Sequence, residues 1–129
     1  RAARPDVAHR TIILDYVNEE SLPSLYSHCL ACVYPSLFEG FGFPVVEAMA
    51  CGAPVLTSQT TSLGEIGEGA ALLVDPLDTG AITTGLRALA RDRELRADLR
   101  AKGLARAASF SWAETGRQTL SAYRRAIAG

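Results

Sequence analysis

Two carboxylates flank a short glycine-rich segment in the first half of the chain. Glu39 and Glu47 are separated by seven residues, with Gly40 and Gly42 between them and Pro44 just before the second acid. Glycine lets the backbone approach a ligand closely because it has no Cβ, and proline fits the first turn of a helix. The N–H groups at a helix start attract anions. We therefore expect a phosphate-bearing ligand here, with the two acids accepting hydrogen bonds from hydroxyl groups on either side of it.

Each of these residues also has a simpler interpretation. Glu47 could only stabilise the first turn of its helix, Glu39 could be an exposed loop acid, and the glycines could be ordinary turn residues. Their combination just before a helix favours a ligand site. The chain contains no G-x-x-x-x-G-K-[ST] loop, no G-x-G-x-x-G after the first expected strand and no G-x-S-x-G motif. A glycosidase-like carboxylate pair remains an alternative.

The elements that position these residues follow from the apolar pattern, which alternates short runs with longer helical ones, as in a parallel α/β fold. Strands are expected at 11–14, 31–34, 53–57 and 71–74, and helices at 21–29 and 44–51. The carboxyl ends of parallel strands form the ligand-binding edge of an open sheet. Three segments are expected at this edge: 15–17, 36–43 and the hydroxyl-rich 57–62.

The last third of the chain predicts helices almost throughout. Asp78 and Asp92 are the expected N-caps of two of them. The buried face of the helix that follows Asp78 is expected to contain Ile82, Leu86 and Leu89. Residues 111–114 have the spacing of a capping box and open a final helix.

Composition limits the functional classes. A chain of 129 residues has room for one modest domain, and its net charge of −1 provides no basic footprint for nucleic acid. The arginines between residues 87 and 106 alternate with acids and are interpreted as solvated helix faces. The first residues lack an apolar signal core and the chain does not begin with Met. This start is typical of a cut through a longer protein or of a processed product.

Three cysteines raise the question of redox or metal chemistry. Cys29 and Cys32 have C-x-x-C spacing, which suits a redox pair or half of a zinc site. Zinc would need further ligands, and only His9 and His28 are available as histidines. We interpret these two and Cys51 as small apolar residues in a buried region, with reduced thiols as in a cytosolic protein.

A longer segment resembles a known family. Residues 34–55, YPSLFEGFGFPVVEAMACGAPV, resemble the signature of retaining GT-B glycosyltransferases, which include the large group-1 family that uses nucleotide-sugars. Residues 19–27, 70–76 and 110–112 extend the similarity. The resemblance implies a Rossmann-like parallel sheet flanked by helices. This sheet would be the C-terminal half of a GT-B fold, incomplete with about four strands, and would end in several helices.

The resemblance also implies roles for individual residues. Glu39 would be catalytic and contact the donor sugar, and Glu47 would accept hydrogen bonds from the ribose hydroxyls. The remaining donor-binding residues would be Gly40, Phe41, Gly42 and Phe43 through their N–H groups, Val46 against the nucleoside, and the backbone of Val17 at the edge of the base. Family members transfer a hexose such as mannose or glucose with retention, without a metal or other cofactor.

Departures from the family pattern limit what residues 1–129 are expected to do. The family usually carries an Arg and a Lys upstream that neutralise the diphosphate, and Asp15 stands where a Gly is common. The chain is interpreted as one partial nucleotide-sugar-binding domain that lacks the N-terminal acceptor domain and is inactive alone. Its expected partners are the donor, that missing domain and an unknown acceptor, but no nucleic acid. The expected location is the cytoplasm, with a peripheral position at the cytoplasmic membrane face as an alternative for the full-length protein.

Two other classes of function remain open from the residues. One is a non-catalytic sugar-nucleotide-binding or scaffolding module that keeps the same fold. The other is a sugar-nucleotide epimerase or hydrolase built on a similar sheet.

Overall fold

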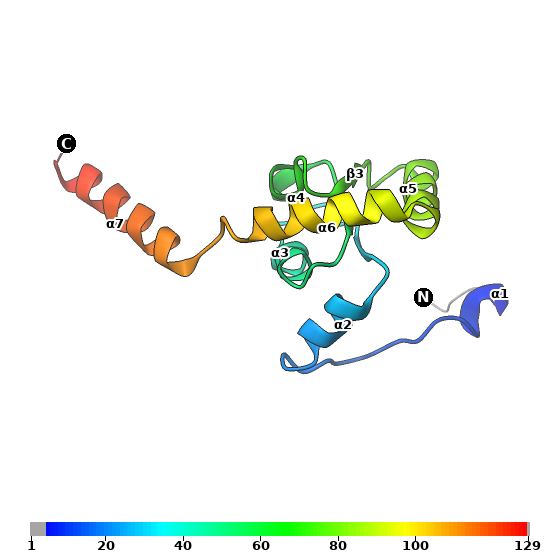
Figure 1. The fold of residues 1–129 in the computed structure, drawn as a ribbon. Helices are drawn as coiled ribbons and strands as arrows, with labels where there is room; N and C mark the ends of the chain where they lie inside the picture. Colours follow the sequence, from blue (N-terminus) through cyan, green and yellow to red (C-terminus); the bar gives the residue numbers. More distant parts are fainter. Residues whose placement is uncertain (1–4, 129) are drawn as a thin grey trace.

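The computed structural model describes residues 5–128, so the expectation about the first residues concerns a segment that lies largely outside the described part. Helices and strands alternate from α2 to β3 and are followed by three longer helices (Figure 1). The elements are α1 (Pro5–Ala8), α2 (Leu22–His28), β1 (Cys32–Tyr34), α3 (Phe43–Ala50), β2 (Val55–Ser58), α4 (Thr61–Gly67), β3 (Leu72–Val74), α5 (Thr79–Arg91), α6 (Arg93–Ala107) and α7 (Trp112–Ala128).

The three strands form a parallel sheet in the order β1-β2-β3. Val33 lies opposite Leu56, which lies opposite Leu72. Consecutive strand residues point to opposite faces, and helices cover both faces, with α6 contributing to the core cluster on each. Val55 packs in a cluster with α3 and α4, whereas Leu56 packs with α5 and the first half of α6. All of β2 is buried, which confirms the predicted α/β sheet with helices on both faces.

The expected strand at residues 11–14 is wrong. This segment is extended but has no strand partner among the described residues, and Ile12, Ile13 and Leu14 are 86%, 76% and 58% exposed. A run rich in β-branched residues favours a pleated, half-buried surface, but it forms a strand only where a neighbour takes its backbone hydrogen bonds. The described sheet therefore has three strands rather than about four.

The predicted helix caps are confirmed, whereas one buried face needs correction. Oδ1 of Asp78 accepts hydrogen bonds from the N–H groups of Gly80 (2.7 Å) and Ala81, and Asp92 caps α6 in the same way. Leu86 is 40% exposed and does not belong to the buried face of α5. Gly85 lies there instead, because a Cβ on it would come within 2.6 Å of Leu56 Cδ1.

Helix α4 was not expected, since its sequence opposes helix formation. It begins at Thr61, whose φ of 56° is rare for a β-branched residue, and it contains Gly64 and Gly67. Its apolar residues Leu63 and Ile66 are buried in the cluster beside α3. Packing of this face therefore outweighs the poor helix propensity.

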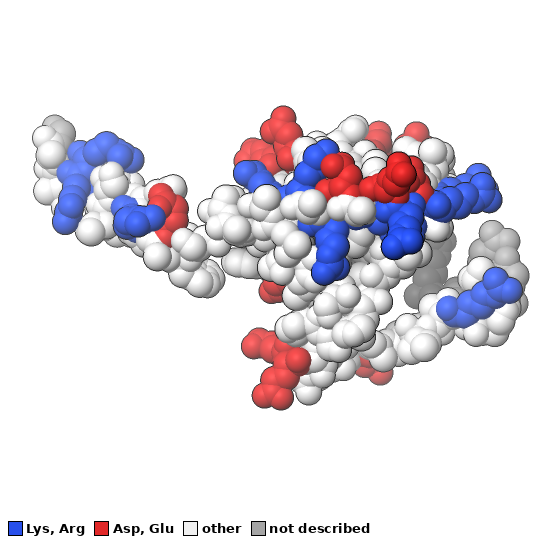
Figure 2. Space-filling view, viewed as in Figure 1, with Lys and Arg blue, Asp and Glu red and all other residues white. Residues whose placement is uncertain are grey.

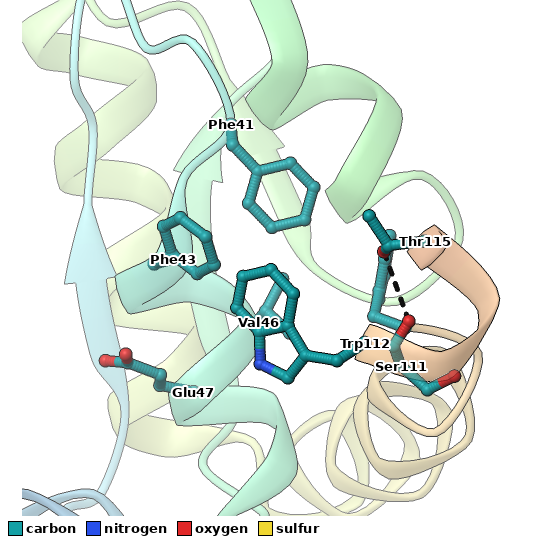
Figure 3. Close-up of a pocket in the computed structure, with 8 residues that line it drawn as sticks. Phe41, Phe43, Val46, Glu47, Ser111, Trp112 and Thr115 are labelled. Carbon is teal, nitrogen blue, oxygen red and sulfur yellow. Dashed lines mark hydrogen bonds between the residues drawn. The ribbon is translucent and has the colours of Figure 1, made fainter. Parts of the chain in front are cut away.

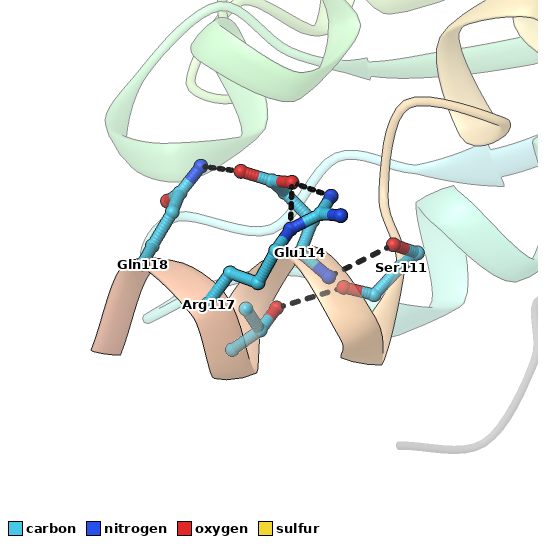
Figure 4. Close-up of polar contacts among 5 residues, drawn as sticks. Ser111, Glu114, Arg117 and Gln118 are labelled. Atoms are coloured by element: carbon cyan, nitrogen blue, oxygen red, sulfur yellow. Dashed lines mark hydrogen bonds and ion pairs between the residues drawn. The ribbon is translucent and has the colours of Figure 1, made fainter. Parts of the chain in front are cut away.

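Helix α7 begins as the sequence predicts and then extends away from the sheet (Figure 1). The Oγ of Ser111 accepts a hydrogen bond from the N–H of Glu114 at 3.1 Å. The carboxylate of Glu114 accepts from Arg117 and Gln118 rather than returning to the cap (Figure 4), and these bonds lower its pKa. No residue of α7 is buried.

The arginines of α6 are more than solvated charges. Basic and acidic side chains lie mixed over this helix (Figure 2), as expected. Three of the arginines also donate to backbone carbonyls of other elements. The bonds join Arg96 to Leu89 (2.6 Å), Arg100 to Gly52 (2.9 Å) and Arg106 to Ile66 (3.1 Å). They tie α6 to α5, to the turn after α3 and to α4.

Across residues 5–128, no helix is both long and apolar enough to cross a membrane.

Replacing Gly64 with Ala is expected to lower the free energy of unfolding by about 2 kcal/mol. A Cβ at this position would lie 2.5 Å from the carbonyl oxygen of Gln59, and backbone cannot rotate away as a side chain can. The matched control is Gly116→Ala on α7, where nothing lies within 4 Å and Ala should be neutral or slightly stabilising. Chemical denaturation of both variants measures the difference. Equal stabilities would contradict the packing of α4.

Candidate functional site

The loop between β1 and α3 is held in place by hydroxyl groups from the segment that follows on β2 and α4. Three of these hydroxyls donate to backbone carbonyls of the loop or of the strand end before it. The bonds are Thr57 Oγ1 to Tyr34 O (2.8 Å), Ser58 Oγ to Ser36 O (2.5 Å) and Ser62 Oγ to Glu39 O (2.9 Å). The segment 57–62 was expected to bond a polar ligand. These hydroxyls instead fix the position of the loop that carries Glu39.

The end of the loop is shaped by Gly42, the N-cap residue of α3. Its φ of 103° lies in the left-handed region that favours glycine. A Cβ there would also come within 2.5 Å of the Cδ2 of Leu63. Pro44 follows in the first turn, as predicted. Gly42 therefore fixes where α3 begins and the direction of its first turn.

Four successive backbone N–H groups at this helix start are free. Within residues 5–128, those of Gly40, Phe41, Gly42 and Phe43 donate to no backbone acceptor. Gly40 has open space around its Cα, so a ligand can approach there. The positive end of the helix dipole lies behind these groups. The arrangement can bind an anion such as a phosphate.

Glu39 is held by a side chain that the sequence did not single out. The hydroxyl of Tyr34, at the end of β1, donates to Oε1 of Glu39 at 2.7 Å. This hydrogen bond is the main cause that raises the pKa of Tyr34. In the described part of the chain Glu39 forms no ion pair. The carboxylate is thus fixed by a neutral donor.

Glu47 lines the edge of a hollow of about 480 Å³ between α3 and the start of α7, which we call the aromatic hollow, and its carboxylate points away from the rings (Figure 3). Figure 3 shows the rings of Phe41, Phe43 and Trp112 at this hollow, with Val46 and Glu47 on the next turn of α3. The Phe43 and Trp112 rings stack with centroids 6.3 Å apart. The hollow therefore combines flat apolar surfaces with one exposed carboxylate.

A second hollow of about 350 Å³ lies on the other side of Glu47, between α2 and α3, and we call it the α2–α3 hollow. Leu22, Pro23 and Tyr26 of α2 supply its apolar lining, and Glu19 lies at its edge. Glu47 lines both hollows. In the described chain, neither hollow is lined by a Lys or an Arg.

The expected site residues are only partly brought together. Phe41, Phe43, Val46 and Glu47 line the aromatic hollow, whereas Glu39 does not. The half-buried Val17 lies in the segment before α2 and lines neither hollow, although Glu19, two residues later, lines the second.

Several residues of the site were missed by sequence reasoning. Phe110 and Trp112 line the aromatic hollow together with Ser111 and Thr115, although they are more than sixty residues from Glu47. Tyr34 reaches Glu39 across a proline-containing turn. The available signals were the lone Trp beside a capping box and the place of residues 110–112 in the family resemblance.

The three cysteines are free thiols. Burial raises the pKa of the Cys32 thiol to about 11, and burial also raises the pKa of Cys29. A raised pKa keeps the thiol protonated and unreactive. Among residues 5–128, no cluster of three or more His, Cys, Asp or Glu could hold a metal ion.

The chain is similar in sequence to a known protein family and to several of its members. Residues 2–106 match the family model of the glycosyl transferases group 1. The chain is 45% identical to O-antigen chain mannosyltransferase B of Escherichia coli over 86% of its length and 29% of that protein. It is 42% identical to an MMP alpha-(1->4)-mannosyltransferase of Mycolicibacterium hassiacum, covering 95% of the chain and 30% of that protein.

A solved structure has a similar fold over most of this chain. Sucrose-phosphate synthase from Thermosynechococcus elongatus superposes with a TM-score of 0.84 at 31% identity, over 95% of this chain and 32% of that one. The chain therefore spans under a third of the length of these relatives.

Cys32 is expected to resist alkylation at pH 8 in the folded protein. With a pKa of about 11, only about one thiol in a thousand is ionised at that pH. Its labelling rate should rise about tenfold for each pH unit up to 11 while the fold persists. Mass spectrometry after iodoacetamide treatment measures this, with urea-unfolded protein as control. Labelling of Cys32 at pH 8 as fast as in urea would contradict its buried, protonated state.

Proposed function

The chain belongs to group 1 of the glycosyl transferases, and we propose that it forms the nucleotide-sugar-binding domain of a retaining, metal-independent hexosyltransferase. Two relatives are named mannosyltransferases, which favours mannose as the first sugar to test. The chain covers under a third of those relatives. The proposed enzyme therefore includes a second domain that binds the acceptor.

The run of free N–H groups at the start of α3 is the observation that carries the proposal. Four adjacent donors on residues 40–43 lack protein acceptors within the described residues, and the carboxylates of Glu39 and Glu47 lie just before and just after them. A diphosphate satisfies such donors, while the hydroxyl groups on the sugar and ribose that flank it can donate to the acids. A nucleotide-sugar has this order of groups.

The remaining roles follow the geometry around Glu47. We assign the ribose to Glu47, because this acid lines both hollows and has no protein partner among the described hydrogen bonds. The base would lie in the α2–α3 hollow. The lining of this hollow is mainly apolar and includes Glu19, two residues after Val17. The backbone of Val17 would then meet the edge of the base, and Val46 would pack against the nucleoside.

The diphosphate requires positive charge from outside the two hollows, since in the described chain no Lys or Arg lines them. Leaving-group charge is stabilised by cations placed in advance. We assign these cations to an upstream segment, where the family carries its Arg and Lys, and we assign the acceptor site to a second domain. The exposed apolar residues Leu120, Tyr123 and Ile127 of α7 support this assignment, because they offer a contact surface.

The proposed reaction retains the configuration of the sugar. The acceptor oxygen forms a bond to the anomeric carbon on the face from which the diphosphate departs. The acceptor proton passes to the leaving phosphate oxygen, so the protein supplies no general base. Glu39 contacts the sugar and stabilises the positive charge that develops on it in the transition state.

A module that binds sugar-nucleotides without turnover is the second candidate. The observation in its favour is the absence of Lys and Arg from the lining of both hollows within the described residues. Transfer activity of the full-length gene product separates the two. Release of free sugar without an acceptor would indicate a hydrolase.

Glu47→Gln should weaken nucleoside diphosphate binding by about tenfold or more, because a carboxylate that accepts two ribose hydroxyls is replaced by a poorer acceptor. Glu39→Gln should leave this affinity within about twofold and lower kcat by about a hundredfold. Isothermal titration and transfer assays on the full-length gene product measure both effects. The control is Glu68→Gln at the exposed end of α4.

Two outcomes would overturn parts of the proposal. An unchanged nucleoside diphosphate affinity in Glu47→Gln would remove the ribose assignment. Full activity of Glu39→Gln would remove the sugar contact.

The same assays with and without EDTA test metal independence, and the product's anomeric configuration, read by NMR, tests retention.

A further inference from the structure

We propose that Tyr34 is a positioning residue for Glu39. Its hydroxyl donates to Oε1 of Glu39 at 2.7 Å and so leaves Oε2 as the oxygen that receives a hydroxyl of the donor sugar. This inference rests on the proposed function, because it requires Glu39 to contact the sugar.

Both partners of this hydrogen bond are anchored to the same neighbouring segment. The carbonyl of Tyr34 accepts from Thr57 at 2.8 Å, and the carbonyl of Glu39 accepts from Ser62 at 2.9 Å. Thr57 is fully buried, so its bond is shielded from water. With both backbones fixed, the phenol–carboxylate bond removes the remaining rotation of the Glu39 side chain. The carboxylate is held in one orientation before the ligand arrives.

The chemistry of a phenol suits this task better than that of a cation. The hydrogen bond raises the pKa of Tyr34, so its hydroxyl remains a protonated donor throughout the physiological range. A Lys or Arg would orient the carboxylate but also neutralise much of its charge. The phenol leaves Glu39 with a negative charge, which can stabilise the positive charge that develops at the anomeric carbon.

A purely structural role for Tyr34 makes different predictions. Its ring packs against the core cluster beside α3, so loss of the ring would disturb the sheet. Tyr34→Phe keeps the ring and removes only the hydroxyl. If the ring alone matters, this variant behaves as the wild type in every assay.

The test is Tyr34→Phe in the full-length gene product, alone and combined with Glu39→Gln. We expect kcat to fall about tenfold in the single variant, as for a lost hydrogen bond to a charged group. The Kd of a nucleoside diphosphate, which has no donor sugar, should stay within about twofold. In the Glu39→Gln background the same substitution should cost less than about twofold, because Tyr34 acts through the carboxylate. Thr83→Val, which removes one exposed hydroxyl on α5, is the control variant.

The outcomes separate this inference from the proposed function. Equal losses in both backgrounds, or a wild-type kcat in Tyr34→Phe, overturn the positioning role but leave Glu39 assigned. A wild-type kcat in Glu39→Gln overturns both. If turnover of Glu39→Gln is too slow to measure, the coupling between Tyr34 and Glu39 is measured by binding instead. The quantity compared among the variants is the ratio of the Kd values for the nucleotide-sugar and the nucleoside diphosphate. Tyr34→Phe should then reduce the extra affinity of the nucleotide-sugar over the nucleoside diphosphate when Glu39 is present, and should not reduce it in the Glu39→Gln background.

Discussion

Three hydroxyl groups hold the loop on which the candidate site depends. Thr57, Ser58 and Ser62 donate to the carbonyls of Tyr34, Ser36 and Glu39, and two of the three are fully buried. A loop normally moves more than the elements it joins, but these bonds attach it to the central strand and to α4. The backbone that carries Glu39 and leads into the glycines is therefore tied to the sheet and to α4.

Packing against α4 sets the other half of the site. Leu63 fills the space that a side chain on Gly42 would need, so the chain turns there in the left-handed region and enters α3 with its first N–H groups free. Glu47 follows one turn later, between the aromatic hollow and the α2–α3 hollow. The order of donors and acceptors along one helix start matches the order of groups along a nucleotide-sugar, and this match is the basis of the proposed ligand.

Sequence reasoning located the glycine loop, the start of α3 and the Asp caps, because these depend on residues close together in the chain. It failed where an element or contact depends on parts of the chain outside its own local sequence. The segment 11–14 has the composition of a strand but no strand partner within residues 5–128, and α4 forms through the packing of Leu63 and Ile66 despite two glycines. The hydroxyls of the segment 57–62 looked available for a ligand, but the fold uses three of them internally. Trp112 reaches the site from more than sixty residues away. Tyr34 lies only five residues before Glu39, but their hydrogen bond depends on how the fold bends the loop between them.

Hydrogen–deuterium exchange at residues 40–43 tests the central claim most directly. The N–H groups of these residues donate to no backbone acceptor within the described chain, so they should exchange rapidly in the free full-length gene product. A saturating nucleoside diphosphate should protect them, since the phosphate oxygens accept their hydrogen bonds. Protection elsewhere with unchanged exchange at residues 40–43 would show that the ligand binds at another site and would contradict the account.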